Sequence, residues 1–188
     1  MPVAPPWPAA VLLDRDGVIN EDSPHYTRNA EEWLPVPGSI EAIAALSAAG
    51  VRIGVCTNQT GIRRGYFGHQ ELAEMHRKMF GLCARHGGRI SLLRYCTHMA
   101  DDGCRCRKPA PGMLLDVCST LGVAPSDCWF VGDSAKDLQA ARSLGCRAIL
   151  VRTGKGRATE RDSAELADAI YNNLADAVRA LDVEVHHV

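Results

Sequence analysis

The chain has 188 residues, with 21 Lys and Arg against 22 Asp and Glu and a formal net charge of −1. This length can bury one sizeable core, so we expect a single domain over residues 1–188, with its core over about 9–155 and a C-terminal helix over about 163–181. The charge balance contains no basic block for nucleic acid or a membrane surface, so we expect neither partner and a small soluble one instead. Nothing indicates more than a monomer. Because the chain shows no signal peptide and no run of about 18 apolar residues, we predict a cytoplasmic protein.

Short apolar runs alternate with amphipathic stretches along the chain, which is typical of βαβ units and a parallel sheet. Each run is too short for a helix and is bounded by polar residues or glycine, as expected for strands that are buried on both faces. The predicted strands cover residues 10–13, 51–56, 90–95, 128–131 and 147–151. We therefore expect an α/β fold with a doubly wound, Rossmann-like parallel sheet.

Helices are predicted between and after these strands. Ser39 can cap the first helix, and Gly50 can end it in the left-handed conformation. The other predicted helices cover about 70–85, 111–121, 135–144 and 163–181. The segments 20–51 and 61–96 contain no insertion that is long enough for a separate cap domain, so we expect an open site.

Polar residues follow the apolar runs where the predicted strands end. Asp14, Thr57, Cys96 and Asp133 each follow a different predicted strand. Open parallel sheets bind their ligands at the carboxyl ends of the strands. The sequence therefore predicts that residues far apart along the chain meet in one site at this edge of the sheet.

The motif Leu13-Asp14-Arg15-Asp16-Gly17 places two carboxylates two positions apart behind a strand. Alone, such a pair is more often a solvated turn than a catalytic site. In a phosphatase, one carboxylate could attack phosphorus while the other moves protons, and a metal ion would shield the repulsion between carboxylate and substrate.

Three further motifs have chemistry that suits a phosphoryl group. Thr57-Asn58-Gln59-Thr60 offers hydroxyl and amide donors, Arg107-Lys108 offers adjacent cations, and Asp133 suits a hard cation such as Mg²⁺. Taken singly, these motifs have simpler explanations, namely a polar turn, a surface charge pair and a helix cap.

In this order and spacing, the four motifs resemble those of the haloacid dehalogenase superfamily of phosphotransferases, over roughly residues 10–155. The resemblance implies that Asp14 forms an aspartyl-phosphate, and that Asp16 protonates the leaving group and then activates the hydrolytic water. It also implies a catalytic Mg²⁺ held by Asp14, by the main-chain carbonyl of Asp16 and by Asp133.

The remaining roles also come from this resemblance. Thr57 and Lys108 would hold and neutralise the phosphoryl oxygens, and Asp137 would orient Lys108. The chemical reason is that a carboxylate is a weak nucleophile toward a dianion, so it needs a cation on each side of the phosphoryl group.

A cluster of cysteine and histidine precedes the two cations. Cys96-x-His98 followed by Cys104-x-Cys106 offers three thiolates and one imidazole, a complete tetrahedral set for Zn²⁺. Because four protein ligands leave no open position, we predict a structural zinc that orders this loop, with loose free thiols as the alternative. Arg107 follows Cys106 directly, so the zinc loop is predicted to aim the adjacent cations at the substrate.

Within the superfamily, the zinc loop is similar to that of a small branch of heptose bisphosphate phosphatases and histidinol-phosphate phosphatases. The stretch 58–67 resembles the heptose group, with Thr60 in place of the usual serine, and so do 107–115 and 151–156. This resemblance implies removal of the 7-phosphate of D-glycero-D-manno-heptose 1,7-bisphosphate on the route to nucleotide-activated heptose. Histidinol-phosphate hydrolysis and a zinc-stabilised binding module are the alternatives. The candidate substrate contacts are Asn58, Gln59, Thr60, Arg107, Arg64 and Asp22.

Overall fold

Six parallel strands form one sheet in the computed structural model, which describes residues 7–186. Residues 1–6 and 187–188, which belong to the predicted domain, lie outside the described residues. The order across the sheet is β3-β2-β1-β4-β5-β6, and every neighbouring pair is parallel, which confirms the predicted doubly wound α/β fold. The strands are β1 (Ala10–Leu13), β2 (Arg52–Asn58), β3 (Leu92–Cys96), β4 (Cys128–Gly132), β5 (Arg147–Val151) and β6 (Ala169–Tyr171).

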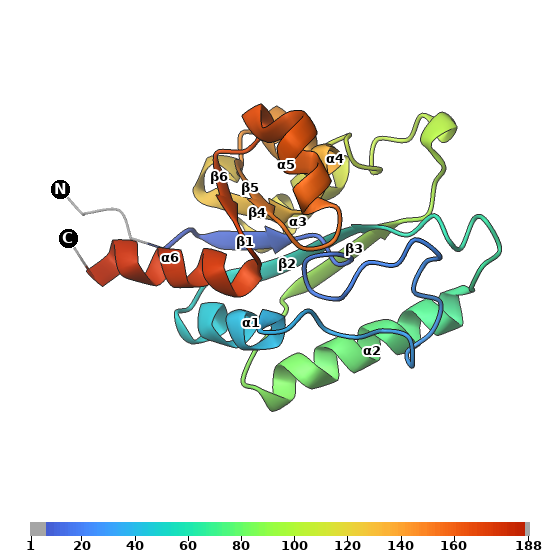
Figure 1. The fold of residues 1–188 in the computed structure, drawn as a ribbon, viewed down its shortest axis with the longest axis horizontal. Coiled ribbons are helices and arrows are strands. Elements are labelled where there is room, and N and C mark those ends of the chain that lie inside the picture. Colours follow the sequence, from blue (N-terminus) through green and yellow to red (C-terminus); the bar gives the residue numbers. More distant parts are fainter. Residues whose placement is uncertain (1–6, 187–188) are drawn as a thin grey trace.

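Helices cover both faces of the sheet (Figure 1). In the view of Figure 1, α1, α2 and α6 lie below the sheet, and α3 and α4 lie above it. The helices are α1 (Ser39–Ala48), α2 (His69–Arg85), α3 (Gly112–Leu121), α4 (Ala135–Leu144), α5 (Gly156–Ser163) and α6 (Leu174–His186). Short 3-10 turns occupy Ala100–Asp102, Pro125–Asp127 and Ala164–Leu166.

Each face of the sheet has its own apolar core, because alternate residues of a strand point to opposite faces. Val11 and Leu13 of β1 pack in the cluster that includes α1, α2 and α6, whereas Ala10 and Leu12 pack in the cluster with α3 and α4. All four side chains are at most 1% exposed. Burial on both faces explains why β1 is a continuous apolar run in the sequence.

The chain order reverses at β1, which has β2 on one side and β4 on the other. At such a switch point, the connections that leave neighbouring strands diverge to opposite faces and open a crevice at the carboxyl ends of the strands. Asp14 follows β1 directly and Asp133 follows β4 directly. The fold therefore brings both residues to this crevice.

The predicted helix over 163–181 is wrong before Leu174, whereas α6 covers residues 174–181. The chain instead makes the end of α5, a 3-10 turn, strand β6 and only then α6. The Asp168 carboxylate accepts a hydrogen bond from the Ala148 backbone N–H at 2.7 Å, which ties this segment to β5 at the edge of the sheet. The Asn173 side chain accepts from the Asp176 N–H at 2.8 Å and so caps the start of α6.

The predicted cap of the first helix is also wrong. Ser39 is the first residue of α1 and is buried, and its hydroxyl donates to the Ile19 carbonyl at 2.7 Å instead of capping the helix. Gly38 takes the N-cap position. Gly50 has φ of +78°, as predicted for the residue that follows the helix.

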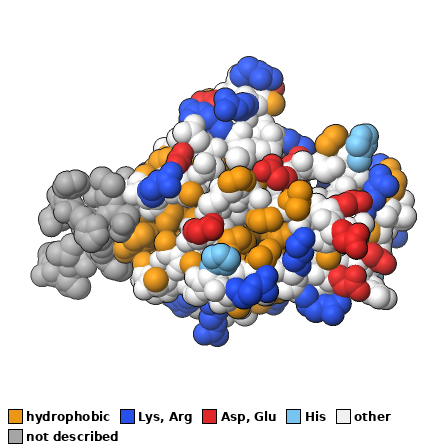
Figure 2. Space-filling view, turned by 60° about the horizontal axis from the view of Figure 1, so that its bottom comes forward, with side chains coloured by type: hydrophobic (Ala, Val, Ile, Leu, Met, Phe, Trp, Pro, Cys, Tyr) orange, Lys and Arg blue, Asp and Glu red, His pale blue; other side chains and the backbone are white. Residues whose placement is uncertain are grey.

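Charged side chains of both signs are interspersed on the face that Figure 2 shows, in keeping with a net charge near zero. Apolar side chains gather between them near the middle of this face. Among residues 7–186, the structure contains no helix with both the length and the apolar character that a membrane crossing requires.

Candidate active site

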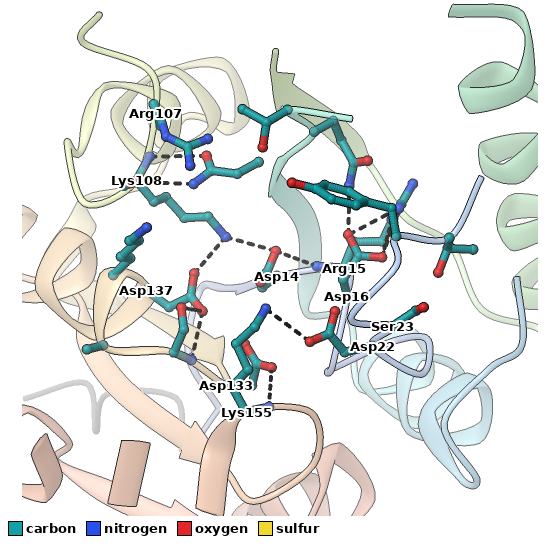
Figure 3. Close-up of a pocket in the computed structure, with 18 of the residues that line it drawn as sticks. Asp14, Arg15, Asp16, Asp22, Ser23, Arg107, Lys108, Asp133, Asp137 and Lys155 are labelled. Atoms are coloured by element: carbon teal, nitrogen blue, oxygen red, sulfur yellow. Dashed lines mark hydrogen bonds and ion pairs between the residues drawn. The ribbon is translucent and has the colours of Figure 1, made fainter. Parts of the chain in front are cut away.

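Asp14 lies at the centre of the crevice, immediately after β1 (Figure 3). Its backbone N–H donates to the Val131 carbonyl at 2.9 Å, which continues the pairing of β1 with β4. Its Oδ1 accepts from the Arg15 backbone N–H at 2.7 Å and lies 2.8 Å from Lys108 Nζ. The strand end and a buried cation together fix this carboxylate.

Lys108 is a buried cation between two carboxylates. The side chain is 2% exposed, and its Nζ lies 2.6 Å from Asp137 Oδ1 as well as 2.8 Å from Asp14. Burial lowers the pKa of Lys108, but the charges of Asp137 and Asp14 outweigh it, so the pKa is raised and the amine stays protonated. The predicted pairing of Asp137 with Lys108 is confirmed. Ser134 donates its backbone N–H and its hydroxyl to Asp137 Oδ2, which fixes that carboxylate in turn.

Asp133 is held in a cradle of two glycine turns. It is 2% exposed, and its Oδ2 accepts from the Lys155 backbone N–H at 2.8 Å. A Cβ added to Gly17 or to Gly154 would lie 2.1 Å from Asp133 Oδ2. Both glycines have positive φ, +83° and +55°. Only glycine lets the two turns approach this carboxylate so closely.

The carboxylates of Asp14, Asp133 and Asp137 form a compact acidic group in which one oxygen of each lies within 4.8 Å of the others. Burial and the charge of Asp137 raise the pKa of Asp14 to about 7. Burial and the charges of Asp137 and Asp14 raise the pKa of Asp133 to about 8. Lys108 alone does not neutralise this group. A hard divalent cation fits it, because Mg²⁺ prefers carboxylate oxygens.

Asp16 is held by three side chains. Arg15 pairs with it at 2.8 Å, Asn20 Nδ2 donates to Oδ1 at 2.9 Å, and Gln59 Nε2 donates to Oδ2 at 2.7 Å. Burial raises the pKa of Asp16, but the charge of Arg15 and the three sets of hydrogen bonds outweigh it, so the pKa lies below its usual value. Sequence reasoning gave no role to Arg15 or Asn20.

The residues at the end of β2 mainly position other groups. Asn58 donates to the Lys108 carbonyl at 3.1 Å and accepts from the Lys108 N–H at 3.2 Å, so it clamps that backbone. Gln59 Nε2 also donates to Thr57 Oγ1 at 2.8 Å. Thr57 is fully buried and does not line the pocket, whereas Asn58, Gln59 and Thr60 do.

The crevice holds a pocket of about 480 Å³ above these groups. Asp22 and Lys155 both line this pocket and form an ion pair, with Asp22 Oδ2 3.0 Å from Lys155 Nζ. Arg107 lines the pocket as predicted. Arg64 does not, because the turn after β2 leaves it exposed and outside the lining. Lys155 was missed as a site residue, although it lies in the segment 151–156 that resembles the heptose group.

The predicted zinc ligands come together. The three sulfur atoms of Cys96, Cys104 and Cys106 lie 3.2 to 3.8 Å apart, and His98 Nδ1 lies 3.4 Å from two of them. A tetrahedral zinc with bonds of about 2.3 Å to sulfur needs sulfur atoms about 3.8 Å apart, so the four donors fit such an ion. Arg107 Nη1 donates to the His98 carbonyl at 3.2 Å, which ties the cation to this loop.

Residues 105–177 match the HAD-hydrolase-like family model. Over 171 residues the chain is 49% identical to the D-glycero-β-D-manno-heptose-1,7-bisphosphate 7-phosphatase of Pseudomonas aeruginosa, covering 91% of this chain and 96% of that protein. The chain belongs to this heptose bisphosphate phosphatase family. The family member from Neisseria meningitidis serogroup B is 47% identical over 149 residues, 79% of this chain and 80% of that protein.

A solved structure of the family superposes closely on this one. The D,D-heptose 1,7-bisphosphate phosphatase of Bordetella bronchiseptica, crystallised with magnesium and phosphate, has a TM-score of 0.89 and 40% identity, over 93% of this chain and 99% of that one. This chain therefore has the same fold as the heptose bisphosphate phosphatases. It is a phosphatase of the haloacid dehalogenase superfamily.

Proposed function

We propose that this phosphatase removes the 7-phosphate of D-glycero-β-D-manno-heptose 1,7-bisphosphate, the activity for which its relatives at 44 and 49% identity are named. The observation that carries the proposal is the position of Asp14, which lies 2.8 Å from Lys108 and in the same acidic group as Asp133. A phosphate bound there would meet a nucleophile, a cation and a metal site together.

In the first step, a carboxylate oxygen of Asp14 attacks phosphorus. The bond from phosphorus to the sugar oxygen breaks, and an aspartyl-phosphate forms on Asp14. Lys108 neutralises charge on the phosphoryl oxygens, and Asp137 keeps Lys108 in place at 2.6 Å. Thr57, at the end of β2, is the further proposed phosphoryl contact, although its side chain is fully buried and outside the pocket lining in the free site.

Asp14, the main-chain carbonyl of Asp16 and Asp133 would hold the Mg²⁺. When bound, Mg²⁺ supplies positive charge that offsets the repulsion between Asp14 and the anionic phosphate. The related Bordetella structure contains magnesium and phosphate, which supports this cofactor. Asp137 belongs to the same acidic group, but its Oδ1 is paired with Lys108, so we give it the role of orienting that lysine.

Asp16 acts as the acid and then as the base. It protonates the sugar oxygen as that oxygen leaves, and in the second step it takes a proton from the water that attacks the aspartyl-phosphate. Arg15 keeps Asp16 ionised in the free site. Binding of an anionic phosphate nearby favours the protonated form, so we predict that the pKa of Asp16 rises in the complex.

The Cys96, His98, Cys104 and Cys106 group would hold a structural Zn²⁺. None of the eight cysteines forms a disulfide, which fits a reducing compartment such as the cytoplasm. We retain the monomer as a proposal.

Phosphate release from three substrates tests the proposed function. We expect Mg²⁺-dependent release from heptose 1,7-bisphosphate, with a preference for the β anomer over the α anomer, and little release from histidinol phosphate. A higher kcat/KM for histidinol phosphate would contradict the substrate. Full activity of Asp14→Asn in clean protein would contradict the mechanism and revive the binding-module alternative.

A further inference from the structure

Arg15 lies between Asp14 and Asp16 in the sequence, yet its side chain is turned into the protein. It is 1% exposed. Its Nε and Nη2 donate to Asp16 Oδ1 at 3.2 and 2.8 Å, and Nη2 also lies 3.1 Å from Oδ2 (Figure 3). A buried guanidinium has donors on both edges that need acceptors, and Asp16 occupies only one edge.

His76 of α2 occupies the other edge. Arg15 Nη1 lies 3.3 Å from His76 Nε2, and His76 is 8% exposed. A guanidinium can only donate, so Nε2 accepts and the ring is the neutral form with its proton on Nδ1. Burial and the charge of Arg15 lower the pKa of His76 to about 4, which keeps the ring neutral. The Tyr95 ring packs nearby, with ring centroids 5.9 Å apart.

A neutral acceptor suits this position better than a charged one. A carboxylate at residue 76 would compete with Asp16 for the guanidinium, and a lysine there would repel it. The imidazole of His76 holds the far end of the long Arg15 side chain and leaves the charge of Arg15 to Asp16. Through this contact, the buried face of α2 reaches the crevice at the end of β1.

We propose that His76 is a positioning residue for the phosphatase reaction, which orients the acid/base group Asp16 through Arg15. The inference rests on the proposed role of Asp16. Proton transfer requires the carboxylate within hydrogen-bond reach of the leaving oxygen, and small displacements of a catalytic group cost large factors in rate. Without the His76 acceptor the guanidinium is held on one edge only, so Arg15 can shift and pull Asp16 away from the position that Asn20 and Gln59 help to fix.

Two substitutions of similar polarity test whether activity depends on how far the side chain at position 76 reaches toward Arg15, and not only on the loss of a buried ring. In His76→Asn the side-chain polar atoms stop near the position of Nδ1, whereas in His76→Gln the amide oxygen reaches the position of Nε2. We expect His76→Asn to lower kcat for the sugar bisphosphate about tenfold with KM little changed, and His76→Gln to restore most of it. If His76→Gln is no better than His76→Asn, the inference is wrong.

A substrate that needs no proton on its leaving group distinguishes a loss of Asp16 positioning from a general disturbance of the active site. p-Nitrophenolate is a stable anion, so its burst from p-nitrophenyl phosphate reports attack by Asp14 without help from Asp16. We expect His76→Asn to change this burst rate by less than about twofold. Equal losses for both substrates would overturn the inference. Met75→Ala, which empties a buried position on the same helix, should lower the melting temperature but leave the ratio of the two rates unchanged.

Asp16→Asn separates this inference from the function on which it rests. If Asp16→Asn hydrolyses the sugar bisphosphate at the full rate, the proposed role of Asp16 fails. If Asp16→Asn loses sugar bisphosphate hydrolysis and keeps the p-nitrophenolate burst while His76→Asn loses neither, only the inference about His76 fails.

Discussion

The two raised carboxylate pKa values decide how the metal site responds to pH. Asp14 and Asp133 have pKa values of about 7 and about 8 in the metal-free site, because both are buried beside other carboxylates. A metal ion binds the ionised forms, so its binding must expel the protons that these groups retain. Both groups ionise as the pH rises toward 8, and the metal site is then ready to bind.

We therefore expect Mg²⁺ affinity to strengthen from about pH 6 to about pH 8, by up to about tenfold per pH unit for each proton expelled. Calorimetric titration in buffers of different ionisation enthalpy measures both the affinity and the protons released. Asp133→Asn should weaken binding and flatten the pH dependence. Asp22→Asn is the matched control, since it removes a pocket carboxylate outside the acidic group, and equal effects of the two substitutions would contradict the assignment.

The two candidate arginines differ in their place relative to the pocket. Arg107 lines it and is tied to the His98 carbonyl, whereas Arg64 is exposed outside it. We expect Arg107→Ala to lower kcat/KM for the bisphosphate by about tenfold or more, and to affect a heptose 7-monophosphate less, because the guanidinium suits the second phosphate. Arg64→Ala should leave both unchanged. Equal losses of Arg107→Ala on the two substrates would show that Arg107 does not read the second phosphate.

At the level of elements, the loop that carries the proposed zinc ligands leads directly into Lys108, the proposed phosphoryl contact. The donor atoms of Cys96, His98, Cys104 and Cys106 already lie close together, with the sulfur atoms 3.2 to 3.8 Å apart, and Lys108 follows Cys106 two residues later. Little apolar content orders residues 99–103, which are mostly exposed, so we expect a bound metal to supply the order.

Removing the metal should therefore disturb both this loop and catalysis. We expect Cys104→Ser to lose the bound zinc, to lower the melting temperature and to reduce kcat about tenfold or more through displacement of Lys108. Elemental analysis should find one zinc per wild-type chain. Cys83→Ala, which removes a buried thiol from α2, should keep the zinc and the activity. A Cys104→Ser protein with full metal content would refute the ligand set.

The stability of the protein should also depend on pH, through His76 of helix α2. The pKa of His76 is about 4 in the folded chain and about 6.5 when unfolded, so between these values the unfolded chain binds more protons. The free energy of unfolding must then fall as the pH is lowered from about 6.5 to about 4, by up to about 3 kcal/mol. Urea denaturation of wild type and His76→Gln across this pH window checks the prediction. The free energy of unfolding should fall by up to about 3 kcal/mol less in the variant than in the wild type. Identical losses would contradict it.

At the scale of the whole molecule, loops from both halves of the sheet converge on Asp133. Gly17 follows β1, Gly154 follows β5, and both turns press against the same carboxylate oxygen. Thr153 Oγ1 donates to the Gly17 carbonyl, which ties the two turns together.

Gly17→Ala should therefore lower activity far more than the positive φ of this residue alone would explain. Its Cβ would lie 2.1 Å from Asp133 Oδ2, whereas a Cβ on Gly145, which has nearly the same φ of +84°, meets nothing within 4 Å. Both substitutions carry left-handed strain of about 1–2 kcal/mol. Only Gly17→Ala should also abolish turnover, and measured kcat and melting temperatures for the pair check this. Comparable activity in the two variants would rule out the close approach.

The central strands and the carboxylates Asp14 and Asp133 of the candidate site could be predicted because their signals are local. Strands β1, β4 and β5 are apolar runs buried on both faces, and Asp14 and Asp133 each follow a strand directly. Strand β6 could not be predicted, because its three residues at the sheet edge are only partly buried and β5 alone pairs with them. A lone histidine has no local signal either. His76 gains its role from Arg15, 61 positions away, and only the packing of α2 brings the two together.

The doubly wound order also has a consequence for protein synthesis. Asp14 is made well before Asp133 and before the turn at Gly154 that encloses Asp133, and domains form from the N-terminus as the ribosome advances. A nascent chain that has completed β1, β2 and β3 holds Asp14, the proposed nucleophile, without Asp133. We therefore expect catalysis only after Gly154 has left the ribosome, and a product that terminates before this turn should be inactive toward sugar phosphates.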